Sequence, residues 1–309
     1  MAVPLVCTLK NCPIEWGYVH YQPSVGGNAF MAAAFGLLAA PAIYLGITHK
    51  VKLFTFCFVM GLVGEVIGYV GRILLHNNPF SENAFLIYLI CATIAPCFTA
   101  AAIYLTLARI VVVFGEGISR IRPRTYTLLF SGFDFIALVV IAVGGGMAAV
   151  AVKQWKIDQG THIMVAGLVV QVVSLVVFVA LCFEYFLRVR KSHSRLNPEY
   201  ATLRDSPRFK RFLYGLAAAT ILLFIRAVYR VAELSGGFRG KLAQDEVLFM
   251  VLDGAMVLLA CIILAIFHPG PAFDGVWEEA SFRWGKKNDS NESMMQDITT
   301  HSVSYNDKR

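Results

Sequence analysis

Three charged residues, Arg226, Arg230 and Glu233, interrupt a stretch that is otherwise apolar, residues 212–234. Their spacing of four and three residues places them on one stripe of a helix. The stretch is long enough to cross a bilayer, where a charge at mid-depth costs about 2.5 to 3.5 kcal/mol. The stripe is therefore expected to face protein or water, where an arginine can bind a phosphate or a carboxylate.

A second charged stripe is predicted within residues 61–72, where Glu65, Tyr69 and Arg72 repeat the same spacing. The same stretch contains four glycines that are three or four residues apart, Gly61, Gly64, Gly68 and Gly71. Small residues at this spacing let membrane helices approach closely. The two stripes carry complementary charges, and a further carboxylate, Asp253, lies in the last apolar stretch. We therefore expect the three stretches to lie side by side.

Two interpretations of these charges stay open. The charged groups can form salt bridges that lock the spans 53–75, 212–234 and 247–267 together. They can also line a polar cavity in the outer half of the bundle, open to the outer leaflet, because intramembrane charges often mark the route of a substrate or ion. The two interpretations are compatible.

Other polar residues inside apolar stretches extend the set of candidates. Asp134 could pair with Arg109, although Arg109 can also reach the inner interface with its long side chain. The substrate-binding residues expected from the sequence are Glu65, Tyr69, Arg72, Asp134, Gln171, Arg226, Tyr229, Arg230, Glu233 and Asp253.

The composition identifies the elements that must position these residues. Of the 309 residues, 57% are hydrophobic and only 15% are charged, and the mean hydropathy is +0.64. These values exclude an ordinary soluble domain. Seven apolar runs are each long enough for a spanning helix: 28–48, 53–75, 84–114, 126–152, 162–187, 212–234 and 247–267. The sequence therefore predicts an all-α, polytopic membrane protein with seven transmembrane helices.

The distribution of basic residues predicts the orientation. If the N-terminus lies outside, 18 of the 27 Lys and Arg residues fall in inner segments and five in outer ones. Positive-inside topology thus favours an N-out, C-in arrangement and accounts for the net charge of +7 without nucleic acid. We expect an extracellular segment (1–27), a seven-helix domain (28–270) and a disordered cytoplasmic tail (271–309). The basic loop 188–211 and the tail leave room for a cytoplasmic partner.

Several classes of site lack the residues they need. The histidines are scattered, and no two cysteines are separated by two residues, so no metal site is expected. No phosphate-binding loop is present, and no cofactor is expected. Of the seven cysteines, Cys7 and Cys12 lie in the segment predicted to be extracellular, where a disulfide between them is allowed but not required.

The ordered motifs along the chain resemble those of the fungal lipid-translocating exporters, also called RTA-like proteins after resistance to aminocholesterol. The resemblance covers residues 21–270 and rests on YQPSVGGN, GEVIGYVGR, APCFTAAAIYLTLARI, FDFIALVVIAVGGG, AGLVVQ, IRAVYRVAELSGGFRG, LDGAMV and FHPG. It implies a seven-helix protein that moves lipids or sphingoid bases across a membrane and protects against toxic amphiphiles. The family usually has serine and glutamine where this chain has Ala137 and Ile141, so the substrate can differ.

The leading hypothesis is a translocator of lipids, sphingoid bases or toxic amphiphiles that is not an enzyme and lies in the plasma membrane. Arg72, Arg226 and Arg230 could bind a phosphate, while the acids balance these charges or bind an amine. The alternative is a seven-helix sensor or receptor-like protein for lipid stress. An intramembrane enzyme is a third interpretation, for which the sequence offers separated carboxylates but no evident nucleophile or metal.

Overall fold

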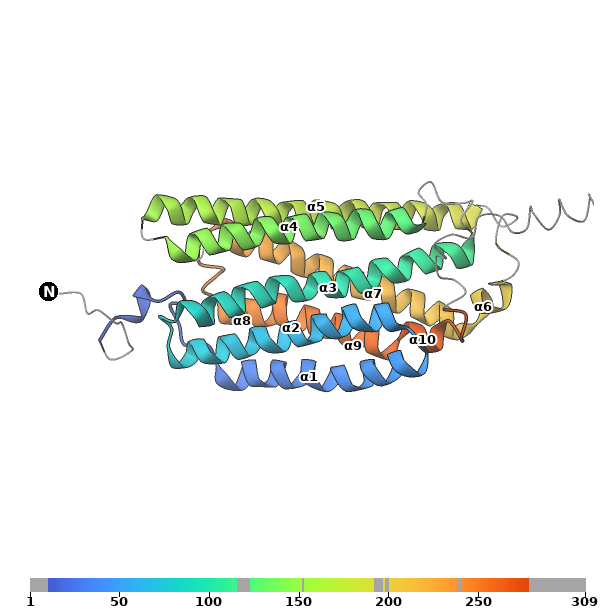
Figure 1. The fold of residues 1–309 in the computed structure, drawn as a ribbon, viewed down its shortest axis with the longest axis horizontal. Helices are drawn as coiled ribbons and strands as arrows, with labels where there is room; N and C mark the ends of the chain where they lie inside the picture. The colour runs from blue at the N-terminus through green and yellow to red at the C-terminus, as the bar shows by residue number, and fades with distance from the viewer. Residues whose placement is uncertain are drawn as a thin grey trace, which may run out of the picture.

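The computed structural model describes residues 11–115, 123–151, 153–191, 197, 200–237 and 240–277. This part of the chain contains helices and no β-strand (Figure 1). The six long helices are α1 (Val25–Thr48), α2 (Lys52–Asn77), α3 (Glu82–Phe114), α4 (Pro123–Val150), α5 (Gln154–Lys191) and α7 (Pro207–Ser235). The seventh span, Glu246–Ile266, comprises α8 (Glu246–Leu248), a π-helical segment (Phe249–Ala255) and α9 (Met256–Ile266). Short helices form at Ile14–Trp16, α6 (Ala201–Asp205) and α10 (Pro269–Ala272).

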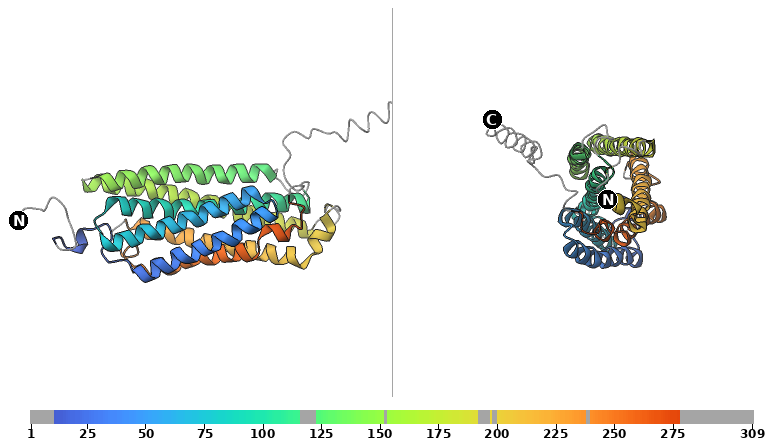
Figure 2. Two further views of the ribbon diagram at one scale, coloured as in Figure 1. Left: turned by 60° about the horizontal axis from the view of Figure 1, so that its bottom comes forward. Right: turned by 90° about the vertical axis from the view of Figure 1, so that its right-hand side faces the viewer.

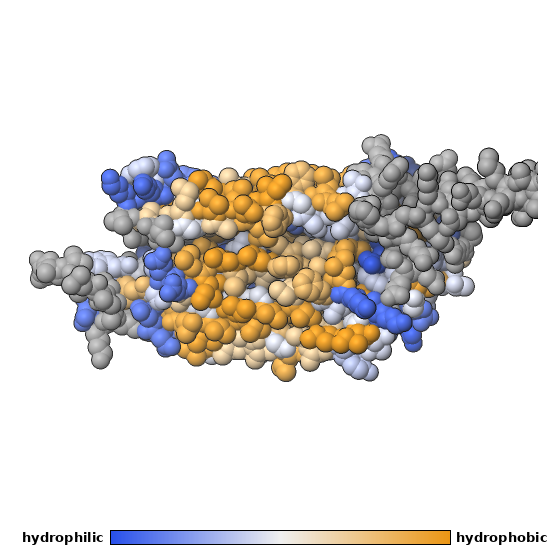
Figure 3. Space-filling model, in the orientation of Figure 1, coloured by the Kyte–Doolittle hydropathy of each residue, from blue (hydrophilic) through white to orange (hydrophobic). Residues whose placement is uncertain are grey.

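The surface has the layered polarity of a protein that crosses a membrane. Seven helical segments of the described chain are long and apolar enough to span a bilayer. Figure 3 shows their apolar side chains as a continuous belt between two polar ends. The predicted all-α architecture with seven spans is therefore confirmed, whereas the N-out orientation stays a prediction.

The spans form a ring in chain order. Each consecutive pair of spans is in contact, α5 packs against α7, and α1 closes the ring against α9. Figures 1 and 2 show α4 and α5 on one side of the bundle and α1 and α2 on the opposite side. The segment before α1 lies at one end of the bundle, and α6 and α10 lie at the other. We call these the N-terminal end and the opposite end.

Glycines bring two pairs of helices into close contact. A Cβ atom added to Gly71 of α2 would lie 2.9 Å from the backbone nitrogen of Tyr88 in α3. Gly144 of α4 and Gly160 of α5 meet each other's helix backbones in the same way. The glycine spacing noted in the sequence therefore corresponds to a face of α2 that packs against α3 without intervening side chains.

The chain after the seventh span closes the opposite end, which differs from the expected tail. Phe273 and Trp277 are buried, and the Arg109 guanidinium lies 3.9 Å from the centre of the Trp277 ring. Arg109 Nε also donates a hydrogen bond to the Trp277 carbonyl at 3.3 Å. Residues 271–277 thus belong to the bundle, and the rest of the tail lies outside the described residues.

The expected disulfide falls partly outside the described residues. Cys12 is disulfide-bonded, whereas Cys57, Cys91, Cys97, Cys182 and Cys261 are free thiols. Cys7 lies outside the described residues, so its bridge to Cys12 stays a prediction.

Because Gly71 lies so close to α3, adding a single methyl group at this position is expected to lower the stability of the protein. Gly71→Ala is expected to destabilise the protein by about 1–3 kcal/mol, because the added Cβ meets the α3 backbone and the helices must separate. Gly132→Ala is the matched control, since nothing lies within 4 Å of the added Cβ there. Thermal unfolding in nanodiscs measures both, and equal unfolding temperatures would show that the helices do not pack this closely.

Candidate functional site

Two arginines of α7 are bound by buried carboxylates. Arg226 Nε and Asp253 Oδ1 are 2.8 Å apart, an ion pair without good hydrogen-bond geometry. Arg230 Nη1 donates to Glu233 Oε2 at 2.7 Å, and Arg230 Nε lies 3.8 Å from the same Asp253 oxygen. All four side chains are at most 4% exposed. Arg226 also donates to the backbone carbonyl of Ala92, which joins the cluster to α3.

The π-helical segment of the seventh span presents Asp253 to α7. Asp253 belongs to the π-helical segment Phe249–Ala255, and the span begins where Asp245 accepts hydrogen bonds from the backbone of α8. A π-turn contains an extra residue, which rotates the following side chains, and such turns often occur at functional sites. Gly254 in this segment lies against the Tyr69 hydroxyl of α2, where a larger residue would clash. The segment therefore joins α2 and α7 through two adjacent residues.

Glu65 is the acid of the cluster that forms no ion pair with the described residues. It is 3% exposed on α2, and its Oε1 atom accepts no hydrogen bond within the described part of the chain. Glu65 lies within electrostatic range of Arg226, Arg230 and Asp253, yet it is in none of the ion pairs of the described residues within 4 Å. When all groups are ionised, two arginines face three acids. The fully ionised cluster therefore has one negative charge in excess, which a proton on Glu65 neutralises.

Arg72 lies nearer the N-terminal end and has its own set of partners. Its Nε atom donates to Asn28 Oδ1 and its Nη2 atom to the Tyr21 hydroxyl, both at 2.9 Å. Glu246 lies 3.8 Å away, and the Phe249 ring centre lies 4.0 Å from the guanidinium carbon. Burial raises the pKa of Tyr21, against the opposing effect of Arg72. The hydroxyl therefore stays protonated, and its oxygen accepts the hydrogen bond from Arg72.

Asp134 and Gln171 lie outside this cluster. The Tyr104 hydroxyl donates to Asp134 Oδ2 at 3.0 Å, and Gln171 Nε2 donates to Cys97 Sγ at 2.9 Å. The predicted pairing of Asp134 with Arg109 is wrong, because Arg109 instead binds Trp277 at the opposite end. Sequence analysis missed Tyr104, whose hydroxyl carries no charge and shows no distinctive spacing.

The two residues that the sequence analysis singled out as possible determinants of substrate choice are packed. Ala137 and Ile141 are buried on α4. A Cβ atom on Gly167 of α5 would lie 3.0 Å from the Ala137 carbonyl and 2.7 Å from Ile141 Cγ1. This face of α4 therefore contacts the backbone of α5 directly. Its two apolar residues leave no space there for a ligand.

The space beside the charged cluster is small. A cavity of about 20 Å³ is lined by Arg72, Arg230 and Glu233 together with Tyr18 and Phe85, which is room for about one water molecule. Tyr229 is also buried near the cluster, and its hydroxyl has no hydrogen-bond partner among the described residues. The structure thus brings Arg226, Arg230, Glu233 and Asp253 together as ion pairs, with Glu65 beside them. The cavity that the described residues form next to this cluster is smaller than a lipid headgroup in this conformation.

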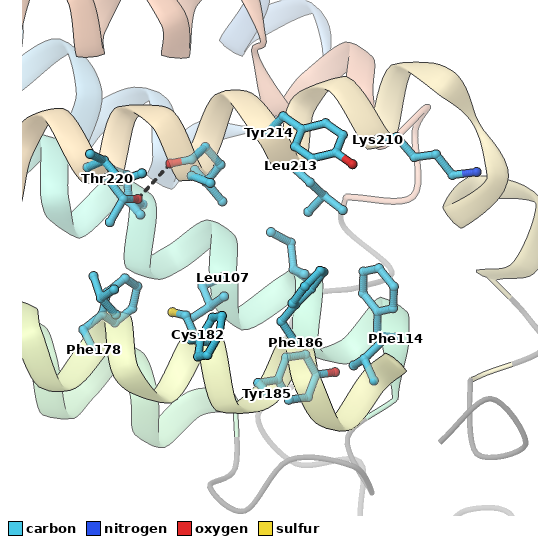
Figure 4. Close-up of a pocket in the computed structure, with 18 residues that line it drawn as sticks. Leu107, Phe114, Phe178, Cys182, Tyr185, Phe186, Lys210, Leu213, Tyr214 and Thr220 are labelled. Carbon is cyan, nitrogen blue, oxygen red and sulfur yellow. Dashed lines mark hydrogen bonds between the residues drawn. The ribbon is translucent and has the colours of Figure 1, made fainter. Parts of the chain in front are cut away.

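Two larger cavities lie near the ends of the bundle. One of about 590 Å³ lies between α3, α5 and α7 towards the opposite end (Figure 4). The other, about 450 Å³, lies at the N-terminal end and includes Trp16, Asp158, His162 and Gly237 in its lining. Sequence analysis missed both. Apolar residues that line the larger cavity have the same pattern as residues that face lipid, and the smaller one is formed by residues from several separate segments of the chain.

Comparison with known proteins identifies relatives. A family model described as RTA1 like protein matches residues 58–276, which include all the predicted site residues. The sphingoid long-chain base transporter RSB1 of Saccharomyces cerevisiae is 34% identical over 287 residues, covering 82% of this chain and 73% of that protein. Protoporphyrin uptake protein 1 of the same yeast is 26% identical, covering 72% and 69% of the two chains. No solved structure matches the chain.

Because Arg226 and Asp253 form a buried ion pair, removing one of them is expected to lower the free energy of unfolding strongly. Arg226→Ala is expected to destabilise the protein by about 3–5 kcal/mol, because Asp253 would keep a buried charge with a weaker partner. Replacing both residues with leucine should lower stability less than Arg226→Ala does, because neither position then carries an unpaired buried charge. Thermal unfolding in nanodiscs measures both variants.

Arg211→Ala provides the control on the same helix. Arg211 is exposed and donates to the Pro207 carbonyl one turn away, so its loss should change stability by no more than about 0.5 kcal/mol. Unfolding temperatures that are the same for Arg226→Ala and Arg211→Ala would refute a stabilising role for the buried pair.

Proposed function

The chain belongs to the RTA1-like protein family, and on that premise we propose that it transports sphingoid bases or related single-chain amphiphiles across the membrane. Its similarity to a sphingoid long-chain base transporter supports a lipid-transporting membrane protein. Within that class, the proposed role is a translocator in the plasma membrane, with the N-terminus outside and without enzymatic activity. The cluster of Glu65, Arg226, Arg230, Glu233 and Asp253 is the proposed headgroup site.

The observation that carries this proposal is the third buried acid, Glu65, beside two arginines that are already paired with carboxylates. An unpaired charge buried in an apolar environment is costly, so the cluster favours uptake of one positive charge. A proton can supply it, and so can the ammonium group of a sphingoid base. An ammonium group can also donate a hydrogen bond to Glu65 Oε1, which has no partner among the described residues.

The same charge balance argues against a phosphate as the group that binds here. Arg226 and Arg230 are already in contact with carboxylates. A phosphate would have to displace those acids and would add negative charge to a cluster that already has an excess. We therefore favour a cationic amphiphile over the phosphate-bearing lipid that the arginines alone suggest.

Transport on this scheme requires a second conformation. The cavity of about 20 Å³ beside the cluster is too small for a headgroup. A route must open next to Glu65, while the ion pairs between α7 and the seventh span keep the charges compensated. The π-helical segment of the seventh span is the proposed point of adjustment, because its turn is less regular than an α-helix.

Glu65→Gln tests the proposed function in liposomes. The variant removes the excess charge and keeps the shape, so flux of a fluorescent sphingoid base is expected to fall at least about tenfold, equivalent to about 1.4 kcal/mol. Glu82→Gln is the matched control, because Glu82 is an exposed acid in the first turn of α3, and its flux should equal that of the wild type.

Two results would count against the proposal. Equal flux through wild type and Glu65→Gln, at equal amounts of folded protein, would remove Glu65 from the transport route. No flux through purified wild type would argue against a transporter and for the alternative of a lipid-stress sensor.

A further inference from the structure

The largest cavity described above is a groove between three helices. It lies between α3, α5 and α7 in the half of the bundle nearer the opposite end, and its volume is about 590 Å³. Pockets that bind small molecules commonly range from about 300 to 1,000 Å³. Figure 4 shows side chains of α5 and α7 facing each other across the groove.

The lining of the groove is suited to a hydrocarbon chain. Leu107, Phe178 and Leu213 represent the aliphatic and aromatic side chains that form most of it. The Thr220 hydroxyl donates to the Leu216 carbonyl within its own helix, so it needs no hydrogen-bond partner from a ligand. Lys210 lies at one end, 3.5 Å from Asp205, and Figure 4 shows its amine directed away from the other lining residues.

The dimensions of the groove match one leaflet of a bilayer. From Lys210 to Thr220 the lining follows α7 for ten residues, which is about 15 Å along a helix axis. The hydrocarbon core of a bilayer is about 30 Å thick, so each leaflet contributes about 15 Å, the same length as the groove. A chain that enters from the leaflet at the opposite end would therefore fit along the groove.

The groove is open on the outer surface of the ring. Tyr214 and Phe183 line it and are 78% and 62% exposed, whereas Ile110 and Tyr185, which also line it, are buried. The buried residues thus form the floor, and the opening lies between α5 and α7, where lipid surrounds the protein. A hydrocarbon chain can enter sideways without crossing water.

The groove also leads towards the charged cluster. Thr220 comes six residues before Arg226 on α7, about 9 Å along the helix axis. Gln171 and Ser174 are buried on α5 beyond the groove, and the Ser174 hydroxyl has no partner among the described residues. The second cavity, of about 450 Å³, lies at the other end between the same three helices and α4. The two cavities thus lie along the same contact between α3, α5 and α7, which we call the seam, and polar side chains lie between them.

We propose that the groove binds the hydrocarbon chain of the transported amphiphile, which then moves along the seam between α3, α5 and α7. This inference rests on the proposed function and adds a chain-binding site to it. The occupant is a molecule with a single hydrocarbon chain and a cationic headgroup. The groove is its entry site from the leaflet at the opposite end, and the cavity at the N-terminal end is its exit.

Photolabelling in nanodiscs tests the chain-binding site. A sphingoid base with a diazirine midway along its chain should label peptides that contain residues 178–189 and 210–221, and excess unlabelled sphingoid base should suppress the labelling. Ala217→Trp places a large side chain in the groove and should reduce labelling at least about fivefold, since overfilling excludes the chain.

The control places the same substitution on lipid-facing surface away from the groove. Ala40 is exposed on α1 and does not line the groove, so Ala40→Trp should leave labelling unchanged. Labelling that is equal in Ala217→Trp and wild type, or spread evenly over all lipid-facing helices as expected for phosphatidylcholine with a diazirine, would overturn the inference.

Flux measured after the same purified variants are reconstituted into liposomes separates the two proposals. Labelling of the groove without flux would support the chain-binding site and contradict transport. Flux without labelling of the groove would support transport and overturn the chain-binding site.

Discussion

The ion pair between Arg226 and Asp253 is the interaction on which the rest of the structure depends. A charge inside a bilayer must be compensated, and these two residues compensate each other across the contact between α7 and the seventh span. The pair holds the last span beside α7, and that span in turn contacts α1, which closes the ring. Arg230 also lies 3.8 Å from the same Asp253 oxygen, in addition to its hydrogen bond with Glu233, so the two carboxylates together orient the arginines of α7.

The excess charge follows from this arrangement. Asp253 and Glu233 form ion pairs with the two arginines, and Glu65 approaches from α2 without an ion-pair partner among the described residues. A purely structural network would gain nothing from a third acid, because an unpaired buried charge lowers stability. A transporter of cationic amphiphiles gains an affinity for positive charge where lipid offers none. In the proposed function, the charged cluster binds the headgroup and the apolar groove binds the hydrocarbon chain.

Much of this arrangement could be predicted from the sequence, and the failures have physical causes. Apolar runs identified the seven spans, and the spacing of Arg226, Arg230 and Glu233 identified their common stripe. The π-helical segment could not be foreseen, because nothing in FMVLDGA distinguishes it from an α-helix. The burial of Arg109 against Trp277 depends on a tertiary contact 168 residues apart. The groove depends on how far α5 and α7 separate, which apolar periodicity does not encode.

Equilibrium binding to protein in nanodiscs tests most directly whether the excess acid recognises an amine. The two ligands to compare are a sphingoid base and its N-acetyl derivative, which has the same chain but no positive charge. We expect the wild type to bind the amine at least about tenfold more tightly, a difference of about 1.4 kcal/mol, and Glu65→Gln to lose this preference. Equal affinity of the wild type for both ligands would contradict the account.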